Sequence, residues 1–442
     1  MMMNSIKHKF LGLFACLVML VAAICGCGEV TPSATPDPTP STQPTPTAQP
    51  TPTPEVKLDV VEDGEMKFLF VRQGDMSNEA RSNTVLLYAS ICNHTGAARV
   101  GISTDDSVEA TDAAEMLIGK TNRPESQLAL EKVGDHGYII TRTKNKLIIA
   151  GTEDNMLALA MIRFTEDILK SEEHCGEGYL KFDEDDEIIY KADDYILLAD
   201  IINGGYDYDI ISTEVMHCPG YTDEITVAQG VASDGEFVYF VTRHFEDTVT
   251  VIQKYKMDTW ELVAQSGELY LGHANDMTFD TKNNRLVVCQ GTATGEIISI
   301  IDPETLELVE NITISKKISA ITYDPVNDRY GTGRGSTKFR IFDNEFNFVE
   351  LHEIEMNDDY VAQGMGSDKN YVYYPRSGDR DNIIEVFTWD GEHVTTLKIK
   401  DPYESESFFW VNGKYYLNYY RYTSSRRGAF LHEIKFNIRY NG

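Results

Sequence analysis

The sequence predicts an α+β segment followed by an all-β segment that folds as a five-bladed β-propeller. Over residues 56–196, strand and helix patterns alternate, as in a small α/β domain. Over residues 197–442, similar segments recur at intervals of 46, 44, 44 and 44 residues, and four short strands fill each interval. Units of about 40–50 residues with four antiparallel strands are typical of propeller blades. The turn residues on which the five segments align are Asp234, Asp280, Asp324, Asp368 and Asn412.

The first 26 residues have the pattern of an export signal. Lys7 and Lys9 precede an apolar stretch over residues 10–24 that is short for a membrane span. It ends in Ile24-Cys25-Gly26-Cys27, which resembles the lipobox of bacterial lipoproteins. The resemblance implies cleavage before Cys27 and a lipid on this cysteine, with the chain held on the outer side of a membrane. Cys25 fits the lipobox less well. An ordinary cleaved signal peptide and an uncleaved anchor are the alternatives.

Residues 27–55 are predicted to be a tether. Nine of the fifteen prolines fall within residues 31–54. Proline fixes φ and lacks an N–H group, so neither helix nor sheet is expected there. An extended chain of about 3.1 Å per residue would separate an anchor from the folded segments.

Charge and cysteine spacing exclude several functions. The formal net charge of −31 disfavours binding of nucleic acid through its phosphates. Beyond the signal, the cysteines lie far apart, which argues against a zinc centre, and no cofactor is indicated. Either one or two disulfides or four free thiols are compatible with this spacing. These cysteines are Cys92, Cys175, Cys218 and Cys289.

Within residues 56–196, strands are predicted over 67–73 and 99–104, and a third apolar run follows over 115–122. A hairpin is predicted over 137–151, with its turn at Lys144-Asn145. Helices are predicted over 79–96, from the spacing of Val85, Leu86, Ala89 and Cys92, and over 154–171.

This segment resembles the non-catalytic α/β accessory domain of glycoside hydrolases such as β-hexosaminidases and α-glucuronidases. The resemblance rests on residues 115–126 and 137–151 and on the helix that follows. It implies a carbohydrate setting but supplies no active-site residue.

The sequence of the repeated segment predicts that its two ends pair with each other and close the ring. The last unit ends after three strands, and residues 208–217 are expected to supply the missing outer strand. A six-bladed ring and an open sandwich are the alternatives. The segment resembles the bacterial extracellular propellers with degenerate repeats, which include lactonase-like and surface-layer proteins. That resemblance concerns architecture, because one fold hosts many activities.

A ligand site is predicted in the central channel, five residues before each aligned turn residue. The side chains there are polar and uncharged, and the next position is mostly small, which is expected to leave room. The ring would bind a neutral polar ligand such as a sugar, with Trp410 and Tyr323 as stacking faces. Alternatively, its members satisfy one another. The five ring positions are Gln229, Asn275, Ser319, Gln363 and Ser407.

An enzymatic function of the propeller is the second hypothesis. His273 and Asp276 lie at the head of one inner strand, and Glu406 and Glu224 are nearby acids. A hydrolase or lactonase acting on extracellular carbohydrate would use Asp276, His273 and Glu406, although the carboxylates expected of a glycosidase are not evident. Alternatively, Asp276 bonds the N–H groups of neighbouring strands. The preferred hypothesis is a membrane-anchored lipoprotein whose propeller binds a carbohydrate or a protein partner, and a purely structural envelope protein is the third.

Overall fold

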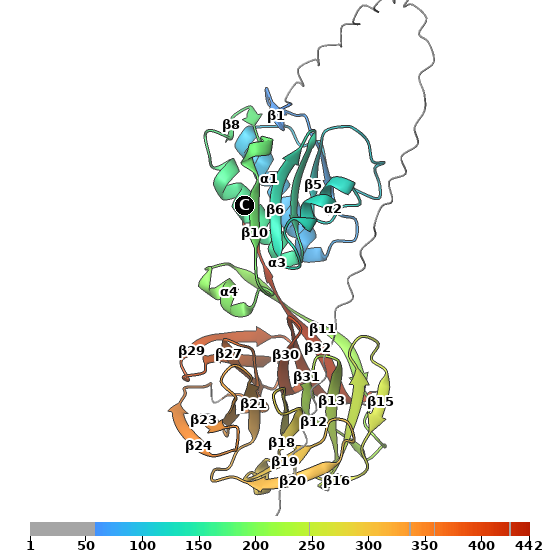
Figure 1. Ribbon diagram of the computed structural model, residues 1–442, viewed down its shortest axis with the longest axis vertical. Coiled ribbons are helices and arrows are strands. Elements are labelled where there is room, and N and C mark those ends of the chain that lie inside the picture. The colour runs from blue at the N-terminus through green and yellow to red at the C-terminus, as the bar shows by residue number, and fades with distance from the viewer. Residues whose placement is uncertain (1–57, 247, 336, 358, 424–425) are drawn as a thin grey trace, which may run out of the picture. The chain divides into compact units, whose positions relative to one another are not determined.

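The computed structural model describes residues 58–442 except 247, 336, 358 and 424–425. The predicted signal, Cys27 and the tether over 27–55 therefore lie outside the described residues. The described part is mostly β, with several antiparallel sheets, and is compatible with a β-propeller (Figure 1).

A six-stranded mixed sheet lies in the first part, in the order β10-β6-β7-β5-β3-β4. β3, β4, β5 and β7 are parallel, whereas β6 pairs antiparallel with β7 and with β10. The β6–β7 hairpin turns at Lys144-Asn145, as predicted. The strands are β3 (Leu69–Arg72), β4 (Ser103–Thr104), β5 (Glu115–Ile118), β6 (Gly137–Thr143), β7 (Lys146–Gly151) and β10 (Ile188–Lys191). A small second sheet holds β1 (Val61–Glu62), β2 (Glu65–Met66), β8 (Cys175–Gly176) and β9 (Tyr179–Leu180).

Both predicted helices are present, and two further helices are not predicted by the sequence. The expected apolar face of α1 is partly wrong, because Val85 and Leu86 are 50% and 43% exposed, whereas Leu87 and Ile91 are buried. The predicted face, which includes Val85 and Leu86, and the buried face, which includes Leu87 and Ile91, have almost the same helical spacing. The spacing of apolar residues alone therefore does not show which of these faces is buried. The helices are α1 (Asn78–Thr95), α2 (Pro124–Glu131), α3 (Asp154–Phe164), continued by a π-helical turn over Thr165–Leu169, and α4 (Leu198–Asn203).

The four cysteines of the described chain are free and buried, in line with the free-thiol alternative. Burial raises the pKa of Cys175 to about 11, which keeps that thiol protonated and unreactive at neutral pH.

Five antiparallel sheets follow within residues 208–438, and four of them take their strands in chain order. The first sheet holds β12 (Ile225–Ser233), β13 (Phe237–His244), β14 (Val249–Lys256), β15 (Leu262–Gln265) and β16 (Leu269–Tyr270), and the second holds β17 (Asp276–Asp280), β18 (Arg285–Cys289), β19 (Ile297–Ile301) and β20 (Leu308–Thr313). The third sheet holds β21 (Ala320–Asp324), β22 (Arg329–Gly333), β23 (Lys338–Asp343) and β24 (Phe348–Glu353). The fourth sheet holds β25 (Val361–Ala362), β26 (Gly366–Ser367), β27 (Tyr371–Ser377), β28 (Asn382–Thr388) and β29 (His393–Ile399). The fifth holds β30 (Glu404–Val411), β31 (Lys414–Tyr422), β32 (Arg427–Ile438) and β11 (Tyr208–Cys218).

The fifth sheet joins the two ends of this part of the chain. β11 pairs antiparallel with β32 from Tyr208 opposite Ile438 to Cys218 opposite Ala429. The predicted pairing of residues 208–217 with the last strand is therefore confirmed. It covers the outer edge of β32, which would otherwise present unpaired backbone groups.

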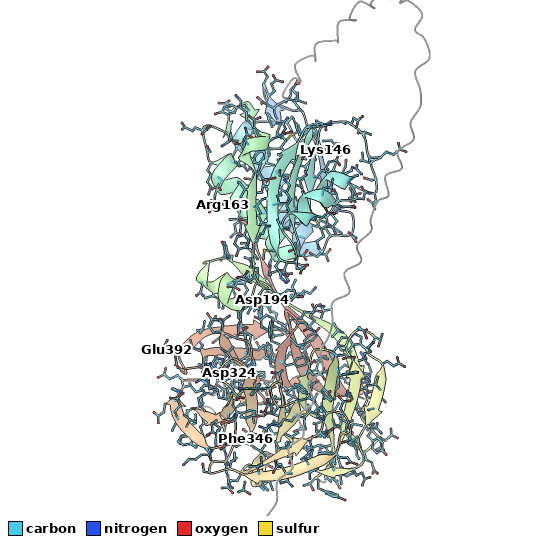
Figure 2. The ribbon with its side chains drawn as sticks, in the orientation of Figure 1. Lys146, Arg163, Asp194, Asp324, Phe346 and Glu392 are labelled. Atoms are coloured by element: carbon cyan, nitrogen blue, oxygen red, sulfur yellow. The ribbon has the colours of Figure 1, made fainter. Side chains whose placement is uncertain are left out.

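The repeat seen in the sequence is the repeat of a side-chain hydrogen-bond motif. In the first sheet, the Asp234 carboxylate accepts the N–H groups of Glu236 and Phe237 at 2.9 and 2.6 Å and the Tyr239 hydroxyl at 2.7 Å. The aspartates of the next three sheets make the same contacts with the second and third following amides and with the side chain of the fifth following residue, which is Arg285, Arg329 or Tyr373. Asp324 of the third sheet is labelled in Figure 2.

Asn412, the fifth aligned residue, plays a different part. Its Nδ2 donates to the Gly235 carbonyl oxygen at 2.8 Å, which ties the turn of the fifth sheet to the turn of the first.

The end of β32 continues into the core of the first part. Asn83 of α1 donates to the Ile438 carbonyl at 3.0 Å and accepts the Tyr440 N–H at 3.0 Å. Tyr440 is buried in the same core as Phe70. The described residues from 58 to 442 form one compact unit, within which the boundary predicted between residues 196 and 197 falls just before α4.

Candidate functional site

One carboxylate bonds to groups of four of the five sheets. Asp276 begins β17 and is 0% exposed. Its Oδ2 accepts the N–H groups of Ile321 and Met365 at 2.9 and 2.8 Å, and its Oδ1 accepts the Ser407 hydroxyl at 2.6 Å and the Met277 N–H at 2.9 Å. These donors come from the second, third, fourth and fifth sheets.

The space around Asp276 is filled. A Cβ added to Gly364 would lie 2.7 Å from Asp276 Oδ1, and one added to Gly230 would lie 2.5 Å from the Met277 nitrogen. The small residues at this level were expected to leave room in the channel. That expectation is wrong, because the room is occupied by the carboxylate and by the backbone of the neighbouring strands.

Burial raises the pKa of Asp276 to about 7, while the bonds from Ser407, Ile321 and Met365 act in the opposite direction. All four contacts donate to the carboxylate oxygens, so no oxygen is turned to solvent. This geometry fits the reading in which Asp276 bonds the N–H groups of neighbouring strands.

The predicted ring of polar residues bonds to protein groups. Ser407 bonds to Asp276, and Gln363 Nε2 donates to Glu404 Oε1 at 2.6 Å. Asn275 Nδ2 donates to the Ser319 carbonyl at 2.6 Å, and Gln229 Nε2 donates to the neighbouring Ala228 carbonyl at 2.5 Å. Ser319 Oγ makes a long contact of 3.4 Å with the Gly333 carbonyl.

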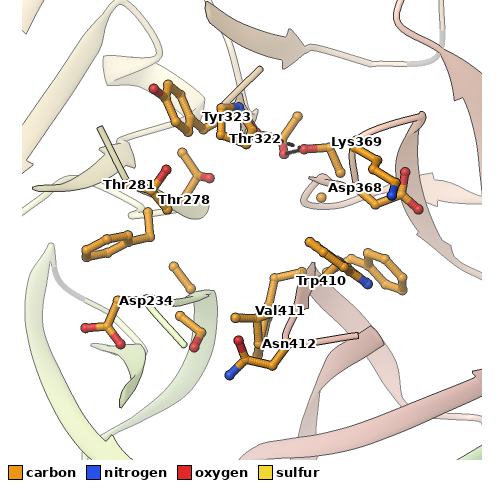
Figure 3. A pocket seen from close by; sticks show the side chains of 18 of the residues that line it. Asp234, Thr278, Thr281, Thr322, Tyr323, Asp368, Lys369, Trp410, Val411 and Asn412 are labelled. Carbon is orange, nitrogen blue, oxygen red and sulfur yellow. Dashed lines mark hydrogen bonds between the residues drawn. The ribbon is translucent and has the colours of Figure 1, made fainter. Parts of the chain in front are cut away.

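A cavity of about 450 Å³ lies farther along the same strands, near the turns at their ends (Figure 3). None of the five ring residues lines it. Trp410 and Tyr323, which the sequence analysis named as stacking faces, both do. The inner strands contribute to it the positions two residues before the aligned turn residues, namely Ala232, Thr278, Thr322, Gly366 and Trp410. The predicted ring lies three residues earlier in each unit.

The polar groups of this cavity, which we call the first cavity, are mainly hydroxyls. Thr322 Oγ1 and Ser367 Oγ share a hydrogen bond of 2.8 Å, and Ser367 also donates to the Tyr323 carbonyl at 3.0 Å. Within the described chain, the hydroxyls of Thr278 and Thr281 make no hydrogen bond to another protein group, so they are available to a ligand (Figure 3).

The charged groups of the first cavity are already paired. Asp368 Oδ2 accepts the hydroxyls of Tyr373 and Tyr415 at 2.7 and 2.8 Å, and Asp234 is held in its turn as described above. Lys369 Nζ bonds to Asp194 Oδ2 at 2.9 Å. The cavity therefore offers a ligand uncharged hydroxyls and aromatic faces such as Phe279 and Trp410.

The predicted catalytic residues lie outside the first cavity. Burial lowers the pKa of His273 to about 4, and Arg243 adds to the effect, so this imidazole is neutral at physiological pH. Burial and the neighbouring Glu404 raise the pKa of Glu406 well above its usual range. Glu224 is an exposed side chain 3.7 Å from His244. None of these predicted residues, Asp276 included, lines the first cavity.

Within the described residues, no three His, Cys, Asp or Glu side chains come together as a candidate metal site. None of the described helices has the length and apolar character needed to cross a membrane.

No protein-family model and no curated protein matches the chain. Among solved structures, it is similar to the glutaminyl cyclase of Myxococcus xanthus, with 10% identity and a TM-score of 0.38 over 52% of this chain and 97% of that one. It is also similar to the hydrazine synthase of Kuenenia stuttgartiensis, with 11% identity and a TM-score of 0.30 over 50% and 65% of the two chains.

Proposed function

We propose that residues 208–438 are a five-bladed β-propeller that binds a neutral polar ligand, of saccharide type, in the first cavity. Support for the five blades comes from the five sheets, from the pairing of β11 with β32, and from the bonds that join four sheets at Asp276. Residues 56–196 are the small α/β domain that precedes the propeller in this proposal.

The ligand class is inferred from the size of the first cavity and from the residues that line it. Its volume of about 450 Å³ falls within the range of roughly 300–1,000 Å³ typical of small-molecule sites. Free threonine hydroxyls suit the hydroxyls of a sugar, and the face of Trp410 suits the apolar face of a sugar ring. A charged ligand would find its potential partners Asp368 and Lys369 already engaged.

The ligand proposal predicts that Trp410→Ala weakens sugar binding about tenfold or more, because a stacking face worth about 1.4 kcal/mol or more is lost. The measurement is a thermal-shift and calorimetric titration of the full-length chain in detergent with neutral cell-wall and plant oligosaccharides, with and without calcium. Trp260→Ala is the matched control, because Trp260 does not line the cavity. If every sugar fails to bind the unsubstituted chain, the saccharide proposal is wrong and a protein partner takes its place.

We also propose that the chain is a lipoprotein, anchored through Cys27 and facing the outer side of a membrane, with residues 1–26 as its signal and 27–55 as its tether. The support is the lipobox-like Ile24-Cys25-Gly26-Cys27 after an apolar stretch.

The anchor proposal predicts that Cys27→Ser moves the protein from the membrane fraction to the soluble fraction or leaves its signal uncleaved. Cys25→Ser is the matched control and should leave both the anchoring and the mature mass unchanged. Intact mass spectrometry of each purified variant, before and after lipase treatment, shows whether the chain carries lipid and whether its signal has been cleaved. A Cys27→Ser chain that still carries lipid would contradict the assignment.

A further inference from the structure

A second cavity adjoins the first one at the β30–β31 hairpin tip, which we define as Val411–Lys414. It has a volume of about 460 Å³. Three residues line both cavities, namely Tyr195, Val411 and Asn412. On its far side, the second cavity is lined by Lys256, Met257 and Tyr416, none of which lines the first.

The shared wall is held in place by short-range packing. The ring of Tyr195 lies so close to Gly413 that any added Cβ would overlap it, and Gly413 has φ +77°, which disfavours other residues. Asn412 bonds to the Gly235 carbonyl, and Asp194, next to Tyr195, is paired with Lys369. An aromatic face and an amide therefore stand between the two cavities.

We propose that the two cavities are neighbouring subsites of one groove and that the ligand is a linear, uncharged oligosaccharide that crosses the hairpin tip. This inference rests on the proposed function of the first cavity and extends it. Each cavity alone lies in the lower half of the size range of small-molecule sites, whereas the two together approach its upper end. The net charge of −31 disfavours a polyanionic polymer.

The second cavity has the rim expected for the outer part of such a groove. Lys256 is 40% exposed and pairs with Asp258 at 3.2 Å, so the rim is polar without an unpaired buried charge. The floor contains Tyr416, which is almost fully buried. A sugar unit held here gains by its linkage to the unit in the first cavity, because its binding is then intramolecular.

The experiment compares affinity with chain length. Isothermal titration of the full-length chain in detergent uses glucose, cellobiose, cellotetraose and cellohexaose, with the corresponding chitin and xylan series in parallel. For the series that binds, we expect at least about tenfold tighter binding of the tetramer than of the monosaccharide. We expect Lys256→Ala to weaken tetramer binding about threefold to tenfold and to leave the monosaccharide unchanged.

Lys282→Ala is the matched control, because Lys282 is also an exposed lysine paired with an aspartate, at 2.7 Å from Asp328, and it lines neither cavity. Tyr195→Ala, with its fold checked by circular dichroism, should reduce the gain with chain length. Equal affinity for monomer and tetramer, or tetramer binding that is unaffected by both Lys256→Ala and Tyr195→Ala, would overturn the groove and leave the first cavity as a monosaccharide site. No binding of any sugar would overturn the proposed function itself, and the groove with it.

Discussion

Replacing Asp276 with alanine is expected to lower the free energy of unfolding by at least about 3 kcal/mol. The substitution leaves the N–H groups of Ile321 and Met365 and the hydroxyl of Ser407 without their acceptor in a site that water does not reach. Each buried group that loses its partner costs about 1–3 kcal/mol. The loss also falls where four sheets meet, so repacking of one strand does not restore the contacts.

Urea denaturation of the full-length chain, followed by circular dichroism, measures this loss. Asp302→Ala is the matched control, because Asp302 lies in a surface turn and accepts the neighbouring N–H groups of Glu304 and Thr305. We expect the control to cost about 1 kcal/mol or less, as for an exposed cap. Equal losses for the two variants would show that Asp276 contributes no more than an ordinary turn residue.

The same carboxyl predicts a dependence of stability on pH. Burial raises the pKa of Asp276 to about 7 in the folded chain, whereas an unfolded aspartate titrates near 3.9. A raised folded pKa means that the contribution to stability is fully present below about pH 4 and is lost as the pH rises through about 7. Asp276→Asn should therefore flatten the pH dependence between these values relative to the unsubstituted chain. A pH dependence between pH 4 and 7 that is unchanged in the variant would show that the four donors offset burial and that the pKa of Asp276 is not raised.

The sequence predicted the period of the sheets because the same type of side chain closes a turn at the same place in four of the units. Asp234, Asp280, Asp324 and Asp368 each close a turn by accepting two backbone N–H groups, and this requirement keeps an acidic residue at a fixed place in each unit. The sequence also predicted that residues 208–217 pair with the last strand, because the last unit contains three strands where the other units contain four.

In every unit the first cavity lies three residues nearer the turn than the predicted ring, because the repeat gives the spacing of the units but does not show which level of the inner strands is open. The level of Asp276 is filled by its carboxylate and by neighbouring backbone. The register shifts between Ala228 and Val231 in β12 and between Ser405 and Ser407 in β30 are also not visible when residues are counted along the sequence. The central position of Asp276 is also invisible in the sequence, since three of its donors lie more than forty residues away.

The other large effect is expected in the six-stranded sheet, where Glu115 is 0% exposed between two buried cations. Its oxygens contact Arg123 Nη2 at 3.1 Å and Lys146 Nζ at 2.7 Å (Figure 2 labels Lys146). Glu115→Ala removes the only carboxylate that the described structure pairs with these cations and should lower the free energy of unfolding by about 3–5 kcal/mol. Asp167→Ala, which breaks the surface pair with Arg163 at 2.6 Å, is the matched control and should cost less than about 1 kcal/mol.

The pH dependence of this site has the opposite sign to that of Asp276. Burial alone would raise the pKa of Glu115, but the bonds from Arg123 and Lys146 outweigh it and lower the pKa. The contribution of Glu115 is therefore present above the ordinary glutamate pKa and is lost as the pH falls through the lowered value. Acid denaturation of the full-length chain and of Glu115→Gln measures this, and the two curves should converge at low pH. Curves that stay parallel would show that the carbonyl oxygens of Thr111 and Ala113, each 2.8 Å from Lys146 Nζ, already stabilise the lysine without the carboxylate.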